Sequence, residues 1–178
     1  MLKAAIYGMG RWGGRLIESV QGSGRIRFVK GITLDSMIHV AGLVSSVYAF
    51  SDRRKLPAEI EIDDTTSMLL KFAGGITGYL GTVFVTGELW RVHVFGAKGW
   101  LEMRGDTELV ACGLEGSPQR ILLPAVDKEK AALEAFADAV VGKQPFLVPP
   151  EEAVNGISVL EAIVASAASG SPVRINQP

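Results

Sequence analysis

A glycine-rich turn near the start of the chain constrains the fold more than any other feature of the sequence. An apolar run over residues 4–7 leads into the pattern G-x-G-x-x-G, formed by Gly8, Gly10 and Gly13, and an amphipathic segment follows. Gly8 permits a tight turn, Gly10 lets the backbone approach a pyrophosphate, and Gly13 allows close packing of helix on strand. A strand, this turn and a helix open a dinucleotide-binding unit, in which N–H groups at the helix N-terminus hold the phosphates.

The segments around this turn predict one β-α-β unit followed by a run of strands. Residues 3–7 and 25–33 are predicted as strands, residues 11–21 as a helix between them, and residues 34–41 as a short helix that Gly42 closes. Alternating or β-branched segments separated by turn signals come next and predict hairpin-connected, mostly antiparallel strands. These predicted strands are residues 44–53, 59–73, 76–86, 89–95, 100–104, 108–114 and 120–123.

Two helices are predicted after these strands. Residues 128–141 carry apolar side chains on one face. A segment from Pro150 or Glu151 to Ser169 does so too, after the start signal Pro149-Pro150 and before the stop signal Gly170. Residues 172–175 complete the prediction as a last short strand. Strands in a row and then helices predict an α+β domain, in which helices cover one face of a large, mostly antiparallel open sheet. The other face is then solvated or buried against another subunit.

Composition narrows the classes of protein to which the chain can belong. The formal net charge of 178 residues is −1, which offers no electrostatic basis for binding nucleic acid or an anionic membrane. We find no apolar stretch long enough to span a membrane and no signal peptide. The single cysteine, Cys112, forms no internal disulfide and is predicted to be a buried small hydrophobe, which fits a reducing cytoplasm.

Three parts of the chain together resemble a known family. They are residues 2–13 with the glycine turn, residues 34–42, and a downstream series formed by 63–75, 94–102 and the helix with Glu134-x-Phe136-x-Asp138. In this order they resemble the glucose–fructose oxidoreductase/inositol dehydrogenase family. Its members pair an N-terminal Rossmann domain with a C-terminal α+β domain on a large open sheet. The resemblance implies hydride transfer between NAD or NADP and a sugar, polyol or related hydroxyl compound.

The sequence also departs from that family's pattern. A doubly wound domain needs several β-α-β crossovers, and only one is predicted here. The family's Glu-Lys-Pro motif has no counterpart, since the similar Lys55-Leu-Pro57 lies in a charged loop past the boundary. The segment with the family's Asp-x-x-x-His pair, which precedes the entry helix in that family, is also not found in this sequence. We therefore expect a truncated Rossmann fragment over residues 1–33 and a C-terminal sheet domain over residues 34–178.

The resemblance implies that the residues of the turn hold the cofactor. These are Gly8, Gly10, Arg11, Trp12 and Gly13, and Arg11 favours NADP over NAD. An acidic ribose-binding residue is expected about 20 residues further on.

Asp35 lies 22 residues past Gly13, so it fits that role if the second strand continues to it. It fits the first turn of the entry helix better, because the residues that follow match a helix.

Few residues of the sequence are candidates for a catalytic or metal-binding role. Asp35 and His39 share one helix face and repeat the spacing Asp-x-x-x-His, so they are the catalytic candidates, although a helix-start Asp and a half-buried His are the simpler interpretation. His93 is interpreted as a sheet or interface histidine. Asp63-Asp64 is interpreted as a turn before a strand. Two isolated histidines and one cysteine predict no metal site.

Two functions follow from the sequence. The first is a truncated oxidoreductase of this family that is catalytically impaired, because the lysine and a well-placed Asp/His pair are missing. The second is a non-catalytic homo-oligomeric binding or scaffold protein, since a lone β-α-β fragment leaves sheet edges uncovered. In both cases we expect a homo-oligomer, a dimer in particular, with a small-molecule ligand as a further partner.

Overall fold

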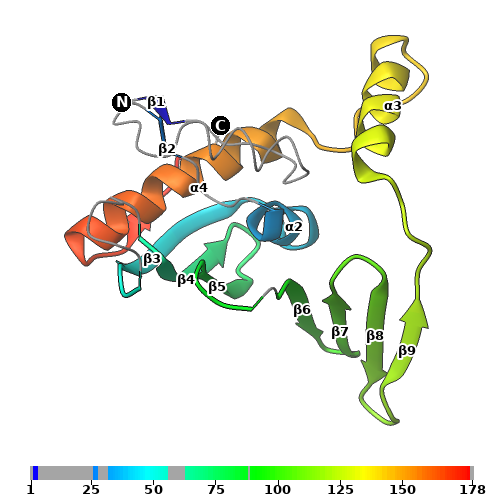
Figure 1. The fold of residues 1–178 in the computed structure, drawn as a ribbon, viewed down its shortest axis with the longest axis horizontal. Helices are drawn as coiled ribbons and strands as arrows, with labels where there is room; N and C mark the ends of the chain where they lie inside the picture. The colour runs from blue at the N-terminus through cyan, green and yellow to red at the C-terminus, as the bar shows by residue number, and fades with distance from the viewer. Residues whose placement is uncertain (1, 4–25, 28–31, 56–62, 88, 177–178) are drawn as a thin grey trace. The chain divides into compact units, whose positions relative to one another are not determined.

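The structure is a computed structural model that describes residues 2–3, 26–27, 32–55, 63–87 and 89–176 (Figure 1). The chain divides into two units, one of residues 1–86 with 147–178 and one of residues 87–146. Both contain strands and helices, which confirms the predicted α+β class. The antiparallel strands form two four-stranded sheets where one large sheet was predicted. The described residues between 83 and 91 form bends or irregular backbone, so no ladder in the described part joins the two sheets.

The first unit begins with two short parallel strands. Strand β1 (Leu2–Lys3) pairs with β2 (Ile26–Arg27), with Leu2 opposite Ile26. Parallel neighbours need a crossover connection of a dozen or more residues, as in a β-α-β unit. The residues between them in sequence hold the glycine turn and the predicted helix 11–21. These residues lie outside the described part of the chain.

The main sheet of the first unit has the strand order β10-β3-β4-β5, and all its neighbours are antiparallel. Its strands are β3 (Val44–Asp52), β4 (Thr65–Phe72), β5 (Thr77–Val83) and β10 (Val173–Arg174). Three of these strands start and end within three residues of their predicted bounds. The exception is β4, which begins at Thr65 where residue 59 was predicted, because Asp63 and Asp64 form a turn before the strand.

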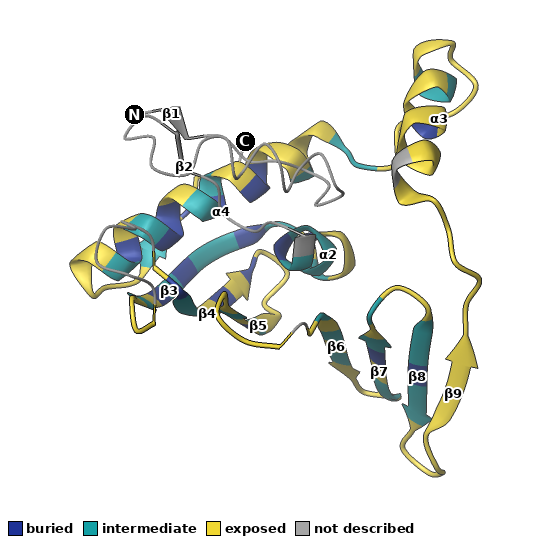
Figure 2. Ribbon diagram, viewed as in Figure 1, coloured by how far each residue is buried: buried dark blue, intermediate teal, exposed yellow. Residues whose placement is uncertain are grey.

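Two helices pack on one face of this sheet. They are α2 (Ile32–Ala41) and α4 (Pro150–Ser169). Helix α4 starts with Pro150 in its first turn and ends at Gly170, which adopts the left-handed conformation with φ 65°. The core lies between sheet and helices and includes Leu34, Val47, Phe72 and Val159 (Figure 2). Apolar side chains at alternate positions of β4 (Met68, Leu70 and Phe72) face this core, and so do Val47 and Ala49 of β3, as the alternation in the sequence predicted. A register shift between Val44 and Ser46 interrupts the alternation at the start of β3.

Two buried polar side chains of α4 bond directly to the backbone of β3. Asn155 accepts a hydrogen bond from Val44 N at 2.8 Å and donates one to Val44 O at 3.0 Å. Ser166 accepts from Ala49 N at 2.9 Å and donates to Ser171 O at 2.7 Å. Strand β10 pairs only with Ser46 and Val47 on this edge of β3. The helix therefore extends the short edge strand with hydrogen bonds on both sides of it.

The opposite face of this sheet is apolar and open. Phe50, Leu69 and Tyr79 are 60%, 58% and 63% exposed. The register sets Leu69 opposite both Tyr48 and Tyr79, so these side chains form a row across three strands. In the described part of the chain, the helices cover only the other face.

The second unit holds the sheet β6-β7-β8-β9 and one helix. The strands are β6 (Arg91–Gly96), β7 (Gly99–Arg104), β8 (Glu108–Gly113) and β9 (Gln119–Leu122), all antiparallel. Helix α3 (Lys128–Val140) follows, and its N-cap Asp127 accepts a hydrogen bond from Lys130 N. The apolar side chains predicted on this helix, such as Leu133 and Phe136, are exposed. Phe136 packs edge-on against Phe146.

Candidate functional site

Three hydroxyl side chains form a row on the inner face of the first sheet. Ser51 on β3 is opposite Thr66 on β4, and Thr66 is opposite Thr82 on β5. The neighbouring inner row is Ala49, Met68 and Leu80, all buried. The inner face thus changes from apolar to polar within two residues on each of three strands. The sequence contains these polar residues at inward-facing positions near the strand ends. The pairing register is needed, however, to show that the three hydroxyl groups lie side by side.

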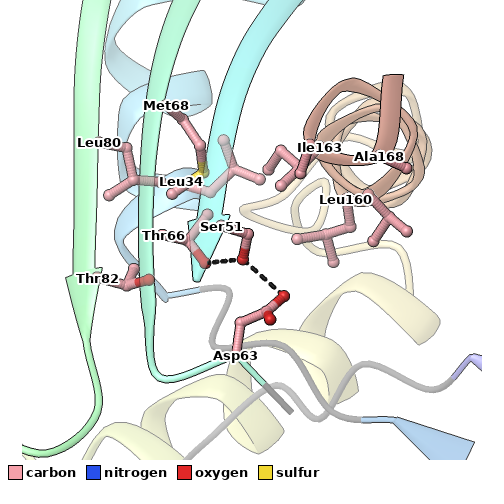
Figure 3. A pocket seen from close by; sticks show the side chains of 12 residues that line it. Leu34, Ser51, Asp63, Thr66, Met68, Leu80, Thr82, Leu160, Ile163 and Ala168 are labelled. Atoms are coloured by element: carbon pink, nitrogen blue, oxygen red, sulfur yellow. Dashed lines mark hydrogen bonds between the residues drawn. The ribbon is translucent and has the colours of Figure 1, made fainter. Parts of the chain in front are cut away.

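A cavity of about 300 Å³ lies between this row and helix α4 (Figure 3). Figure 3 shows Leu160, Ile163 and Ala168 on the helix side and Leu34, Met68 and Leu80 on the other, with the hydroxyl groups and Asp63 at one end. Val164 and Ala167 also contribute to its wall. The cavity is therefore an apolar chamber with one polar end, which is the usual composition of a small-molecule site.

The hydrogen bonds at the polar end have a definite direction. Ser51 donates its hydroxyl proton to Asp63 Oδ2 at 2.7 Å, and its oxygen lies 2.8 Å from Thr66 Oγ1. A serine hydroxyl carries one proton, so the bond between the two hydroxyls must be donated by Thr66. The order is thus Thr66 to Ser51 to Asp63. These two hydrogen bonds commit the hydroxyl protons of Thr66 and Ser51.

The neighbouring Asp64 holds the turn on which Asp63 lies. Its buried carboxylate accepts hydrogen bonds from Arg54 N and from Lys55 N, the latter at 2.6 Å, and from the Thr65 hydroxyl. Asp64 N in turn donates to Asp52 O. These bonds confirm the interpretation of Asp63-Asp64 as a turn before a strand. They also add a role for Asp63, which the sequence did not suggest, at the mouth of the cavity.

The two catalytic candidates on α2 have different neighbours in the structure. His39 is exposed, and its Nδ1 lies 3.4 Å from Glu152 of α4. Asp35 is half-buried, and its Oδ1 lies 3.3 Å from a β-carbon placed on Gly156, so it faces α4 instead. Burial raises the pKa of the Asp35 carboxyl above its usual value. Within the described residues no hydrogen bond or ion pair joins Asp35 to His39.

The remaining candidates have structural roles or lie outside the described residues. His93 stacks on Phe95 with ring centroids 4.0 Å apart and meets Trp100 edge-on, which confirms a sheet histidine. Cys112 is half-buried, not fully buried as predicted, because its thiol reaches the Gly116 carbonyl in the adjoining turn. The cofactor candidates Gly8, Gly10, Arg11, Trp12 and Gly13 lie outside the described residues.

The searched residues contain no group of three or more side chains suited to a metal. No helix in the described part is long and apolar enough to cross a membrane.

Comparison with known protein families identifies the family to which the chain belongs. Residues 31–175 match the family described as "Oxidoreductase family, C-terminal alpha/beta domain", which carries the designation Gfo/Idh/MocA. The chain belongs to this oxidoreductase family. The match confirms the resemblance drawn from residues 34–42 and the downstream strands, and it covers the inner cavity with all its lining residues.

Solved structures of the Gfo/Idh/MocA family share this fold. Aldose–aldose oxidoreductase from Caulobacter crescentus is 21% identical with a TM-score of 0.70, covering 81% of this chain and 45% of its own. Levoglucosan dehydrogenase in complex with NADH and L-sorbose is 18% identical with a TM-score of 0.69, and an NAD-binding oxidoreductase from Klebsiella pneumoniae is 21% identical with a TM-score of 0.65. These cover 82% of this chain and 48% and 49% of their own. The chain thus spans less than half the length of these relatives.

Proposed function

We propose that this chain is a catalytically impaired member of the NAD(P)-dependent oxidoreductases that act on sugars and polyols. In this proposal, residues 1–33 form a shortened dinucleotide-binding fragment, and residues 34–178 form the family's C-terminal domain. The proposed location of the protein is the cytoplasm. The position of the two candidates on α2 carries the proposal. General acid–base transfer needs a titrating group within reach of the proton that it moves. His39 instead pairs with Glu152, and Asp35 faces α4.

The glycine turn supports retention of a cofactor. The parallel pairing of β1 with β2 fits the crossover unit that such a turn requires. Gly8, Gly10 and Gly13, with Arg11 and Trp12 beside them, would hold NAD or NADP, which supplies hydride transfer when bound. The backbone N–H groups of the turn would bind the pyrophosphate.

A titration of NADH and NADPH, followed by tryptophan fluorescence, tests the cofactor part of the proposal. We expect saturable quenching that Gly10→Val abolishes, because a side chain at this position blocks the approach of the pyrophosphate. An assay of turnover tests the proposed loss of catalytic activity. We expect no change in nicotinamide absorbance with a panel of sugars and polyols. Turnover that His39→Asn or Asp35→Asn abolishes would refute the impairment, and quenching unchanged in Gly10→Val would refute the cofactor site.

The open face of the first sheet favours a second candidate function, a homodimeric binding or scaffold protein. Phe50, Leu69 and Tyr79 form an apolar surface on this face, and exposed apolar surfaces of this kind mark interaction sites. Light scattering should give twice the chain mass of 19.0 kDa. Tyr79→Lys should shift the protein to monomer, whereas Leu133→Lys on the exposed side of α3 should not. A monomer in the unaltered protein would exclude this candidate.

A further inference from the structure

One hydroxyl group at the polar end of the inner cavity has an uncommitted proton. Thr66 donates its proton to Ser51 at 2.8 Å, and Ser51 donates its own to Asp63 at 2.7 Å. Thr82 lies opposite Thr66 in the register and lines the same end (Figure 3). Its hydroxyl has no hydrogen-bond partner among the described residues. Thr82 therefore offers one donor to a ligand, and the oxygen of Thr66 keeps the capacity to accept.

This end matches a single alcohol hydroxyl. A hydroxyl group has one proton to donate and an oxygen that accepts. The β-carbons of directly opposite strand residues lie about 4.5–5.5 Å apart, so one ligand oxygen can lie between Thr66 and Thr82. In that position it accepts the Thr82 proton and donates its own proton to Thr66 Oγ1. Both capacities of the ligand hydroxyl and the one uncommitted proton of this end are then satisfied.

The charges around the cavity do not favour an ionic ligand. The described residues that line it include no lysine, arginine or histidine, so an anion meets no counter-charge. Asp63 is the one carboxylate in that set, and it is exposed and already accepts a hydrogen bond from Ser51. Water therefore weakens its attraction for a cation, because Coulomb energies fall as the dielectric constant rises. A neutral ligand fits this lining best.

The apolar walls determine the rest of the ligand. Leu34, Met68, Leu80 and Ile163 line the cavity and are between 1% and 6% exposed. A volume of about 300 Å³ is near the lower limit of ligand pockets, which span roughly 300–1,000 Å³. Further hydroxyl groups on a ligand would lie against these walls without partners, and burying an unpaired hydroxyl is unfavourable.

We infer that this cavity binds a small neutral mono-alcohol with a compact aliphatic body, whose hydroxyl lies between Thr82 and Thr66. The inference goes beyond the oxidoreductase function proposed above and does not rest on it, because sugars and polyols carry several hydroxyl groups and this cavity pairs only one.

A matched pair of probes tests the inference on the full chain. Isopentanol and isopentyl chloride have the same aliphatic body, and chlorine replaces the hydroxyl in the second. Binding is followed by the methyl resonance of Met68, which lines the cavity, with Met103 in the other unit as an internal reference. We expect saturable shifts of Met68 with both probes and no shift of Met103. Glycerol should give no saturable shift at concentrations at which isopentanol saturates.

Variants of two threonines on β5 locate the hydrogen bond. Thr82→Val removes the hydroxyl and keeps the shape of the side chain, so isopentanol affinity should fall about tenfold, as expected for one lost hydrogen bond, while chloride affinity stays unchanged. Retained chloride binding shows that this variant is folded. Thr82→Ser keeps a hydroxyl and should preserve the isopentanol affinity. The matched control is Thr77→Val, whose exposed side chain lies outside the cavity lining and should leave both affinities unchanged.

Several results would overturn the inference. An isopentanol affinity that is unchanged in Thr82→Val, or that falls no more than the chloride affinity, would exclude recognition of the alcohol by Thr82. Glycerol binding at least as tightly as isopentanol would show that the cavity takes polyols. The absence of a saturable Met68 shift with isopentanol would show that no alcohol binds there.

Discussion

Replacing Ser166 by alanine should destabilise the first unit, although the side chain removed is small. Ser166 is fully buried, accepts the Ala49 N–H at 2.9 Å and donates to Ser171 O at 2.7 Å. Strand β10 does not reach Ala49, so no ladder bond replaces the serine. A buried donor left unpaired costs about 1–3 kcal/mol. Alanine recovers roughly 0.5 kcal/mol of helix propensity, so we expect a net loss of about 1.5 kcal/mol.

Calorimetry and amide exchange measure this loss globally and locally. A change of 1 kcal/mol shifts the Tm of a protein of this size by about 2–4 °C, so Ser166→Ala should lower it by roughly 3–6 °C. The Ala49 amide should exchange faster, because it loses its acceptor. The matched control is Ser158→Ala on the same helix. Ser158 is half-buried, and its hydrogen bond to Val154 O is exposed and lies within the helix, so its loss should leave Tm within about 1 °C.

The reasoning would be refuted if the two serine variants had the same Tm, or if Ala49 stayed protected in Ser166→Ala. The first result would mean that water or a backbone shift satisfies the Ala49 N–H at no measurable cost. The second would mean that another acceptor replaces Ser166 in the native state. Either result would remove the claim that α4 completes the edge of β3 through directional bonds.

Three further predictions concern burial and charge. Leu34→Ala should cost about 2–5 kcal/mol, measured by urea unfolding, because Leu34 is almost fully buried in the core. Asp35→Asn should raise Tm at pH 7. Burial raises the pKa of Asp35, so its contribution to stability is present below the unfolded value of 3.8 and is lost as pH rises through the folded value, and the two proteins should converge in acid. Glu102→Gln should lower Tm at pH 7. The Arg104 hydrogen bond and nearby guanidinium charges hold the pKa of Glu102 below 4.5, so the stabilisation is present above 4.5 and is lost as pH falls through the folded value. Thermal unfolding over pH 2–7 checks both signs.

The sequence predicted the bounds of most helices and strands, but it did not predict which residues come together at the candidate site. Periodicity and the turn glycines located β3, β5 and the second unit's strands to within three residues, and the Pro150 and Gly170 signals bounded α4. These are local effects of dihedral preference and alternation. The start of β4 was missed because Asp64 binds the N–H groups of Arg54 and Lys55, which are ten and nine positions away in sequence. Secondary-structure propensity, which is judged over a short window of sequence, cannot detect such a contact.

The same limit explains why the cavity could not be predicted. Its polar end needs Ser51, Thr66 and Thr82 in one register row, and register is a property of strand pairing. Asp35 and His39 show the same limit within a single helix. Their spacing places them on one helix face, but α4 provides Glu152 for one and a close approach at Gly156 for the other. Spacing within an element predicts proximity, and the elements packed against it decide the partners.

The buried polar residues of α4 also explain how the cavity can persist in a close-packed unit. Protein interiors normally leave few voids, so a helix free to move along the sheet would close this one. Asn155 and Ser166 bond α4 to β3 at Val44 and Ala49, on both sides of the helix turns that carry Leu160 and Ile163. Moving the helix toward the hydroxyl row would break directional bonds to buried backbone groups. The anchors therefore keep the apolar wall apart from the polar end, and weakening them should allow the cavity to close as the unit loses stability.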